Sequence, residues 1–481
     1  MNKQITVSRH SRRQFIRYGS LAVGGAMMTG PYIVRGQNLN GKLNIAQIGC
    51  SGKGGSDAAC IFHAEQNLVA LCDVNQRALD GLKHYLPNAT TYKDYRDLLD
   101  KEKNLDAVDI AIPDHMHAVV AATAIKLGKH VYCQKPLTHD VFEARTLRKL
   151  AHDHNVATQM GNQGSASDLL RRAVEIVQAG VIGAVKTAYV WTNRPVWPQG
   201  MDRPPGSDPV PPFLDWNLWL GTAPERPFKA DWPGGNPASW APPGAGVYQP
   251  FNWRGWQDFG TGALGDMACH TVNWPFRALN LGYPTEIEAT SSGMNTEMYP
   301  RTSQIRFEFP ARKGLPAATL HWSDGGTKPP PDVTADIVAT MGKVSDSGCL
   351  MVGDKGVIFS PDDGDQDLRT YIKMKGDSDM VGSEKHDAVK GIPRTIPRNA
   401  FEGVPDQRQH MEWIQACKDG KHDVAYSNFD IAAYLTEIIL LGCVALRAGR
   451  KLEWDGPAMR AKNAPEAELF VKRTYREGWS L

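Results

Sequence analysis

Two side chains suited to acid–base chemistry stand four residues apart in the segment Gly260–His270. Asp266 and His270 are one helical turn apart, so both would lie on the same face of a helix. With an ordinary pKa of about 6.5, the histidine could take a proton from a hydroxyl, while the acid orients the ring or the substrate. We expect Asp266 in the first turn of that helix, where negative charge is favoured. From these residues alone, the pair could also cap the helix or supply half of a metal site. The surrounding sequence offers no further cluster of metal ligands, so we predict none.

A second group of residues is typical of a phosphate-binding loop. The glycine-rich segment Gly49–Gly55 follows a short apolar strand, and Ser56–Ala64 has helical character. Glycines permit a tight turn and let backbone N–H groups reach a pyrophosphate at the start of a helix. The loop residues expected to contact a dinucleotide are Gly49, Ser51, Gly52, Lys53 and Gly54. Ser51 stands where the usual motif has its middle glycine, and the loop by itself would also suit an ordinary turn.

An acidic residue follows at the distance that such a loop requires. The apolar strand Leu68–Cys72 ends at Asp73. An acid roughly 20 residues after the first glycine hydrogen-bonds the adenosine ribose and repels a 2′-phosphate, which favours NAD over NADP. The alternative is a solvated acid in a turn.

Strand and helix patterns alternate through this part of the chain. Further strands are expected at Ala107–Ile112, His130–Cys133 and Val156–Met160, with helices between them. Alternating strands and helices predict an α/β fold with a parallel sheet and right-handed crossovers. The ligand would bind beyond the carboxyl ends of the strands, where Pro113–His117 and Gln134–Pro136 also lie.

The loop, Asp73, the run Pro113-Asp-His-Met-His117 and the run Gln134-Lys-Pro-Leu137 together resemble the Gfo/Idh/MocA oxidoreductase family. Its members include inositol and sugar dehydrogenases, glucose–fructose oxidoreductase and NAD-dependent glycosidases. The resemblance extends from about Lys42 to Trp454. It implies an N-terminal Rossmann domain, followed by an α+β domain whose open, mostly antiparallel sheet carries the substrate site.

The resemblance also implies roles for individual residues. Lys135 matches the lysine that lies beside the nicotinamide and holds a substrate hydroxyl, although Gln134 replaces the family's glutamate. The Asp266–His270 spacing matches a second family signature, in which the histidine takes the proton. Cofactor contacts are further expected from Pro113, His117, Gln134 and Asn162, and substrate contacts from Gln163 and Asn193.

The second domain begins with an unusual insertion. Residues 198–260 are rich in proline, glycine and tryptophan, and we expect them to surround the substrate cleft. Trp253 and Trp256, close to Asp266, are the candidates for stacking on a sugar, with core packing as the alternative. The expected organisation is a signal and linker at 1–37, the NAD-binding domain at 38–160, the substrate domain at 161–455 and a tail at 456–481.

The N-terminus and the composition predict the location and the partners. Ser11–Arg17 contains paired arginines before a short, glycine-rich apolar stretch, as in a twin-arginine export signal, which predicts a periplasmic or otherwise exported protein. The stretch is too short for a stable membrane anchor. The chain has 54 Lys+Arg and 52 Asp+Glu, which argues against nucleic acid as a partner. The expected partners are the export machinery, a carbohydrate and, by resemblance, further copies of the chain.

These observations converge on one kind of chemistry. We expect an NAD-dependent oxidoreductase that transfers hydride from a sugar or cyclitol hydroxyl, with NAD tightly bound because an exported enzyme has no obvious nicotinamide supply. The alternative is a redox-neutral NAD-dependent glycosidase, lyase or epimerase that oxidises its sugar only transiently. A binding protein on an inactive scaffold is a third reading, which the joint presence of Lys135, Asp266 and His270 disfavours.

Overall fold

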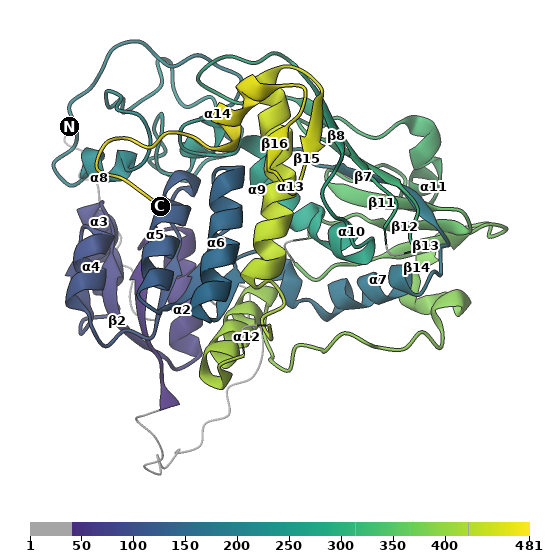
Figure 1. Cartoon of the computed structure of the whole chain (residues 1–481), viewed down its shortest axis with the longest axis horizontal. Helices are drawn as coiled ribbons and strands as arrows, with labels where there is room; N and C mark the ends of the chain where they lie inside the picture. Colours follow the sequence, from purple (N-terminus) through teal and green to yellow (C-terminus); the bar gives the residue numbers. More distant parts are fainter. Residues whose placement is uncertain (1–40, 313, 365, 422) are drawn as a thin grey trace, which may run out of the picture.

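The computed structural model describes residues 41–481 apart from 313, 365 and 422. The expected export signal and linker at 1–37 therefore lie outside the described residues. The chain forms two sheets, one at each side of the molecule, with helices packed between and around them (Figure 1). This is the predicted α/β class.

The N-terminal sheet is a six-stranded Rossmann sheet. Its strand order is β3-β2-β1-β4-β5-β6, and every neighbouring pair is parallel. The strands are β1 (Asn44–Ile48), β2 (Asn67–Cys72), β3 (Thr90–Tyr92), β4 (Ala107–Ile110), β5 (His130–Cys133) and β6 (Thr158–Met160). The order reverses between β1 and β4, which is where a ligand is expected in such a sheet.

Helices cover both faces of this sheet. They are α2 (Lys53–His63), α3 (Gln76–Lys83), α4 (Tyr95–Lys101), α5 (Asp114–Lys126) and α6 (Val141–His154). Ile45 of β1 faces a cluster that contains Ile61 of α2 and Trp413 of the distant helix α12 (Pro405–Asp419). Ala46 and Ile48 face the opposite side, toward α5 and α6. A helix from the C-terminal part of the chain thus completes one face of the N-terminal sheet.

The second sheet has ten strands and is open. Its order is β14-β13-β12-β11-β7-β10-β9-β8-β15-β16, and all pairs are antiparallel except β7 with β10. The strands are β7 (Val185–Trp191), β8 (Glu286–Ser291), β9 (Ser303–Phe309), β10 (Ala318–Ser323), β11 (Gly348–Gly353), β12 (Gly356–Ser360), β13 (Tyr371–Met374), β14 (Val381–Gly382), β15 (Leu452–Asp455) and β16 (Arg460–Ala461). This confirms the predicted open, mostly antiparallel sheet.

The helix α13 (Phe429–Ala448) joins the two halves. It packs against α6 of the N-terminal half and against α9 and β8 of the C-terminal half. At Gly442 a Cβ atom would lie 2.6 Å from Leu264 Cδ2, so a glycine is needed where α13 approaches α9. Among the described residues, α13 is the one helix long and apolar enough to cross a membrane, and 83% of its most apolar window is buried inside the protein. The remaining helices are α7 (Asp168–Gln178), α8 (Trp216–Leu220), α9 (Gly262–Thr271), α10 (Asn273–Ala278), α11 (Pro331–Met341) and α14 (Glu468–Val471).

The insertion at 198–260 has little regular structure but its own apolar core. Trp219, Trp232 and Trp256 pack there with Tyr248 and Phe259. Backbone hydrogen bonds join the insertion to the Rossmann domain: Asp215 N donates to Val74 O at 2.9 Å, and Gln76 N donates to Phe213 O at 2.7 Å. The insertion is therefore fixed over the carboxyl end of β2.

Candidate active site

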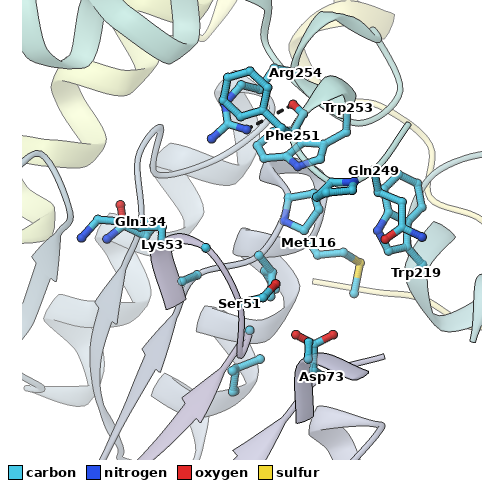
Figure 2. A pocket seen from close by; sticks show the side chains of 18 of the residues that line it. Ser51, Lys53, Asp73, Met116, Gln134, Trp219, Gln249, Phe251, Trp253 and Arg254 are labelled. Carbon is cyan, nitrogen blue, oxygen red and sulfur yellow. Dashed lines mark hydrogen bonds between the residues drawn. The ribbon is translucent and has the colours of Figure 1, made fainter. Parts of the chain in front are cut away.

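A cavity of about 1030 Å³ lies where the Rossmann loops, α9 and the insertion meet. Figure 2 shows Ser51 and Asp73 on one side of it and Trp219, Gln249, Phe251 and Trp253 on the other. The volume is at the upper end of the roughly 300–1,000 Å³ typical of ligand sites. The sequence-predicted residues that line it are Gly49, Ser51, Gly52, Lys53, Asp73, Pro113, Gln134, Lys135, Gln163, Trp253, Asp266 and His270.

The glycine loop has the shape of a phosphate cradle. Gly49 has φ 93°, and a Cβ there would lie 2.1 Å from Ala111 O. A Cβ on Gly54 would lie 2.0 Å from Gly49 O, so glycine lets α2 begin directly against the end of β1. Gly52 has φ 56° and a Cβ there would meet open space, which leaves room for a ligand. Within the described chain, no side chain caps α2 and its first turn carries no acid. The start of this helix therefore favours an anion such as a pyrophosphate.

Asp73 stands at the end of β2, where an adenosine ribose is expected. Its Oδ2 accepts a hydrogen bond from Cys50 N at 2.8 Å, and its Oδ1 accepts one from Asn75 N at 2.8 Å. These bonds fix the carboxylate against the loop, and its remaining lone pairs could accept the ribose hydroxyls. Burial raises the pKa of Asp73. The loop and this acid together fit NAD.

At the other end of the cavity, one carboxylate holds two cations. Lys135 Nζ donates to Asp266 Oδ1 at 2.8 Å and to the Asp266 carbonyl at 3.0 Å, while Arg254 Nε donates to the same Oδ1 at 3.0 Å. Burial alone would raise the pKa of Asp266, but Lys135 and Arg254 outweigh it and hold that pKa well below its usual range. Asp266 is the fifth residue of α9, which corrects the expectation that it lies in the first turn.

His270 lies one turn further along α9, with its ring at the cavity. Its exposed fraction is 4%, and Nδ1 has no hydrogen-bond partner among the described residues. Burial, followed by the charge of Lys135, lowers the pKa of His270 to about 3. The ring is therefore neutral near pH 7. His270 lines the cavity and lies near the end of α9, so the Asp266–His270 pair does not cap the start of this helix.

Gln134 stands where the Gfo/Idh/MocA motif has a glutamate, and its contacts account for an amide at this position. Its Nε2 donates to Asp57 Oδ2 at 2.8 Å, and both side chains are buried. A carboxylate at position 134 would face the carboxylate of Asp57, whereas the amide donates to it. The chain before Lys135 is thus fixed by a neutral partner. The Gln134 side chain is also closely packed against Gly161, where a Cβ atom would lie 2.5 Å from Gln134 Nε2.

Lys53 lines the cavity, but its ammonium is used elsewhere. It pairs with Asp57 and lies 2.7 Å from Asp406 Oδ2, so its charge is neutralised beside α12. Lys53 thus lines the cavity as expected of a loop residue, while its ammonium is bound to carboxylates of α2 and α12. His410 lies beside the same carboxylates. The ligating atoms of Cys60, Asp406 and His410 lie within 4.8 Å of one another, as do those of Asp57, Asp109 and His410. The Lys53 ammonium already satisfies two of these acids, and the structure shows an ion cluster joining α2 to α12.

Two predicted cofactor residues lie behind the cavity wall. His117 is 1% exposed, with Nδ1 2.8 Å from Pro136 O and Nε2 2.7 Å from Ile112 O, so it ties two strand-end loops together. Asn162 donates through Nδ2 to Cys269 O at 3.0 Å and accepts from Ser427 Oγ at 2.6 Å. It therefore positions α9, and with it His270, instead of lining the cavity.

Two predicted substrate residues also lie outside the cavity. Asn193 is exposed and accepts a hydrogen bond from the neighbouring Arg194. Trp256 is 0% exposed, and its Nε1 donates to Val247 O at 3.0 Å within the insertion core. The stacking role expected of Trp256 is thus corrected to packing, whereas Trp253 does line the cavity. Gly54 also lies behind the loop, packed against Gly49.

The residues that sequence reasoning missed come mostly from the insertion and its flanks. Arg254 is the most informative, because its guanidinium lies 4.4 Å from the Trp253 ring centroid and 4.5 Å from that of Phe251 while it binds Asp266. Its only sequence signal is a cation among aromatic residues shortly before Asp266. The other missed residues include Met116, Arg194, Trp197, Trp219, Trp240, Gln249 and Asp363.

Comparison with protein families matches residues 43–162 to the GFO_IDH_MocA model, described as "Oxidoreductase family, NAD-binding Rossmann fold". Levoglucosan dehydrogenase of Pseudarthrobacter phenanthrenivorans is 24% identical over 181 residues, which are 37% of this chain and 34% of that protein. Inositol 2-dehydrogenase of Burkholderia multivorans is 31% identical over 147 residues, 30% of this chain and 43% of that protein. The matched segments thus span less than half of either relative.

Solved structures resemble this fold over most of the chain. An inositol dehydrogenase homolog of Azotobacter vinelandii, complexed with NADH and myo-inositol, has a TM-score of 0.55 at 14% identity and covers 86% of this chain and 98% of its own. Levoglucosan dehydrogenase, complexed with NADH and levoglucosan, has a TM-score of 0.55 at 15% identity and covers 86% and 100%. At such identities the likeness concerns the fold. Together with the family match and the glycine cradle, it identifies residues 43–162 as an NAD-binding Rossmann domain similar to that of the Gfo/Idh/MocA oxidoreductase family.

Proposed function

We propose that the protein is an NAD-dependent oxidoreductase that acts on a hydroxyl of a sugar or cyclitol. The observation that carries the proposal is the convergence of Lys135, which follows β5, with Asp266 and His270 of α9 in the cavity that also contains the glycine loop. Relatives named for levoglucosan and inositol support the substrate class. The aromatic side chains of Trp219, Phe251 and Trp253 support it further, because flat apolar rings suit the C–H faces of a sugar.

Each polar residue of the site has a separate role in the proposed reaction. The glycine loop and Asp73 would hold NAD+, which would supply the acceptor for a hydride from the carbon that bears the reacting hydroxyl. His270 accepts the hydroxyl proton, so loss of one hydride and one proton leaves a carbonyl on the substrate. Lys135 donates a hydrogen bond to the substrate oxygen and stabilises negative charge that develops there. Asp266 holds the ammonium in place, and Arg254 prevents the carboxylate from turning away.

We further propose that NAD stays bound between turnovers and that the protein is exported through the twin-arginine pathway. The insertion fixed over β2 supports retention, and the Ser11–Arg17 pattern supports export of an already folded, cofactor-loaded protein. Replacing Arg12 and Arg13 with lysine should keep the protein in the cytoplasm when cells are fractionated. Assembly into a homo-oligomer stays a prediction.

The function is tested without added cofactor. Purified protein is denatured and the released NAD quantified by chromatography, while intact protein is incubated with sugars, cyclitols and oligosaccharides and the products are followed by mass spectrometry. We expect near-stoichiometric NAD and conversion of a carbohydrate. Accumulation of an oxidised product with NADH identifies a net dehydrogenase, whereas cleavage or epimerisation without net NADH identifies the redox-neutral alternative.

Variants connect the activity to the site. Lys135→Met and His270→Asn should each lower turnover by at least about 100-fold, in line with the 10²–10⁴-fold contribution of general acid–base groups, while NAD stays bound. Asn193→Ala is the control, because this exposed side chain lies outside the cavity. Unchanged turnover in either cavity variant would contradict the proposal.

A further inference from the structure

The last ten residues, 472–481, form a tail that crosses the molecule. After α14 the tail leaves the large sheet, runs beside α8 of the insertion and ends above the helices of the Rossmann domain (Figure 1, yellow). It contains no long helix or strand. Its position therefore depends on specific side-chain contacts, and these involve the Rossmann domain and the insertion together.

Arg473 is the first anchor. Its guanidinium lies 2.9 Å from Glu143 Oε1 and 3.4 Å from Asp140 Oδ2, both at the start of α6. The same group donates to His115 O at 2.7 Å and to Thr222 Oγ1 of the insertion at 3.0 Å. One side chain thus ties the tail to two parts of the molecule.

Two further anchors follow within three residues. The Tyr475 hydroxyl donates to Glu143 Oε1 at 2.6 Å. Arg476 donates to Asn217 O at 2.7 Å and to Gly221 O at 3.0 Å, both in the insertion at α8. Such a series of charge-assisted bonds holds the segment that follows in a defined place.

That segment brings Trp479 to the edge of the cavity. Trp479 lines the cavity together with Lys93, Asp94 and Tyr95. Its ring centroid lies 6.4 Å from that of Tyr95, and the Arg96 guanidinium lies 4.7 Å from it. These residues follow β3, which is the neighbour of β2 on the side away from β1. Because Asp73 at the end of β2 marks the ribose, this edge is the adenine end of the site.

We propose that Trp479 is a cofactor-binding residue, and that the tail closes the adenine end of the cavity so that NAD is released slowly. The inference rests on the proposed function, since it assigns a device for the retention proposed there. An indole ring at this position offers a flat face to a nucleobase, a contact that tolerates any base because every base has a π-face. Arg473, Tyr475 and Arg476 are positioning residues that hold the tail.

The test compares NAD release among single variants of the full chain. Each protein is loaded with NAD+, desalted, and sampled over time for NAD in the filtrate. Trp479→Ala should release NAD roughly tenfold faster or more, because one base–aromatic contact is worth that much in affinity. Trp479→Phe keeps an aromatic face, so it should release NAD at a rate between those of wild type and Trp479→Ala. Deletion of residues 478–481 should reproduce the alanine variant.

Two controls separate this role from a general loss of structure. Glu477→Ala changes an exposed residue of the same tail, and Leu469→Ala removes an apolar side chain of α14 that is 57% exposed and lies outside the cavity lining. Both should release NAD at the wild-type rate. All variants should show the wild-type circular dichroism spectrum in saturating NAD.

Failure of the role inferred for Trp479 and failure of the proposed NAD retention would give different results. If wild type retains NAD and Trp479→Ala retains it equally, the inference is overturned while the function stands. If wild type is isolated without NAD, the proposed retention fails, and the same variants are compared by calorimetric Kd for added NAD+. Equal Kd values would then overturn the role of Trp479.

Discussion

Asp266 is a buried carboxylate that pairs with two cations at the site. Its side chain is 9% exposed, and the two cations that it holds, Lys135 and Arg254, are 16% and 21% exposed. A buried charge is stable only while its partners are in place, so loss of the carboxylate leaves two desolvated cations close together. The attraction of Lys135 and Arg254 for the ionised carboxylate also lowers the pKa of Asp266.

Asp266→Asn should therefore destabilise the protein even without substrate or cofactor. We expect a loss of about 3–5 kcal/mol in the free energy of unfolding, the usual cost of breaking a buried pair. Urea denaturation of NAD-free protein measures it. The control is Asp97→Asn, which removes an exposed ion pair with Lys101 and should cost less than about 1 kcal/mol. Equal effects in the two variants would show that the cluster is not desolvated as described.

Single site residues could be predicted from the sequence where their spacing along the chain is itself characteristic. Asp266 and His270 lie one helical turn apart in any helix, and Asp73 follows the glycine loop at a fixed distance. Arg254 could not be found in this way, because its partner is reached only through the fold of an irregular segment. Trp253 and Trp256 show the same limit, since Trp253 in the 3-10 turn Asn252–Gly255 lines the cavity, whereas Trp256, the extended residue after the turn, is buried in the core.

Helix α2 and strand β1 form the element on which cofactor binding depends. The helix starts so close to the strand that Gly54 nearly touches Gly49 O, whereas the neighbouring Gly55 has space. A Cβ on Gly55 would lie 3.8 Å from Cys50 O, an ordinary contact. Gly54 and Gly55 are therefore suited to a comparison of alanine substitutions, one at a closely packed position and one with space, in the same turn of α2.

Gly54→Ala should push α2 away from β1 and distort the phosphate cradle. Overpacking of this kind costs typically about 1–3 kcal/mol, and NAD affinity should fall with it. Gly55→Ala should leave both quantities close to wild type. Unfolding curves and calorimetric NAD binding measure the two effects, and an equal loss of affinity in both variants would contradict the close approach inferred here.

Most elements were predictable from apolar runs and alternation, but short ones were not. The expected helix at Ser56–Ala64 in fact begins at Lys53, because glycines at its start mask the helical pattern. Strand β3 and helix α4 were missed since Thr90–Tyr92 is brief and largely exposed. Helix α11 was missed because prolines at 329–331 resemble a loop, although proline suits the first turn of a helix.

At the scale of the whole molecule, the cavity walls come from the Rossmann domain, the C-terminal domain with its insertion, and the tail. A ligand that contacts all of these parts holds them together, and it stabilises the folded state because it does not bind the unfolded chain. The sequence could not predict this closure. Contacts such as Arg473 with Glu143 join residues more than 300 positions apart and carry no local pattern.

Removal of NAD should lower the melting temperature, and its return should restore it. At a free NAD concentration 100 times Kd, the gain is about 2.7 kcal/mol, or several degrees for a protein of this kind. Scanning calorimetry before and after stripping measures it. NADP+ at the same concentration should restore less, because Asp73 repels a 2′-phosphate. Equal restoration by both nucleotides would contradict the role assigned to Asp73.

The packing of α12 on the N-terminal sheet has a consequence for how the chain is made. Ile45 and Tyr132 emerge early from the ribosome, but Trp413, which covers them, is synthesised some 280 residues after Tyr132. The nucleotide-binding half therefore stays partly uncovered through most of translation. Its maturation waits for the far end of the polypeptide, and an early stop codon would leave an apolar surface that quality-control proteases can recognise.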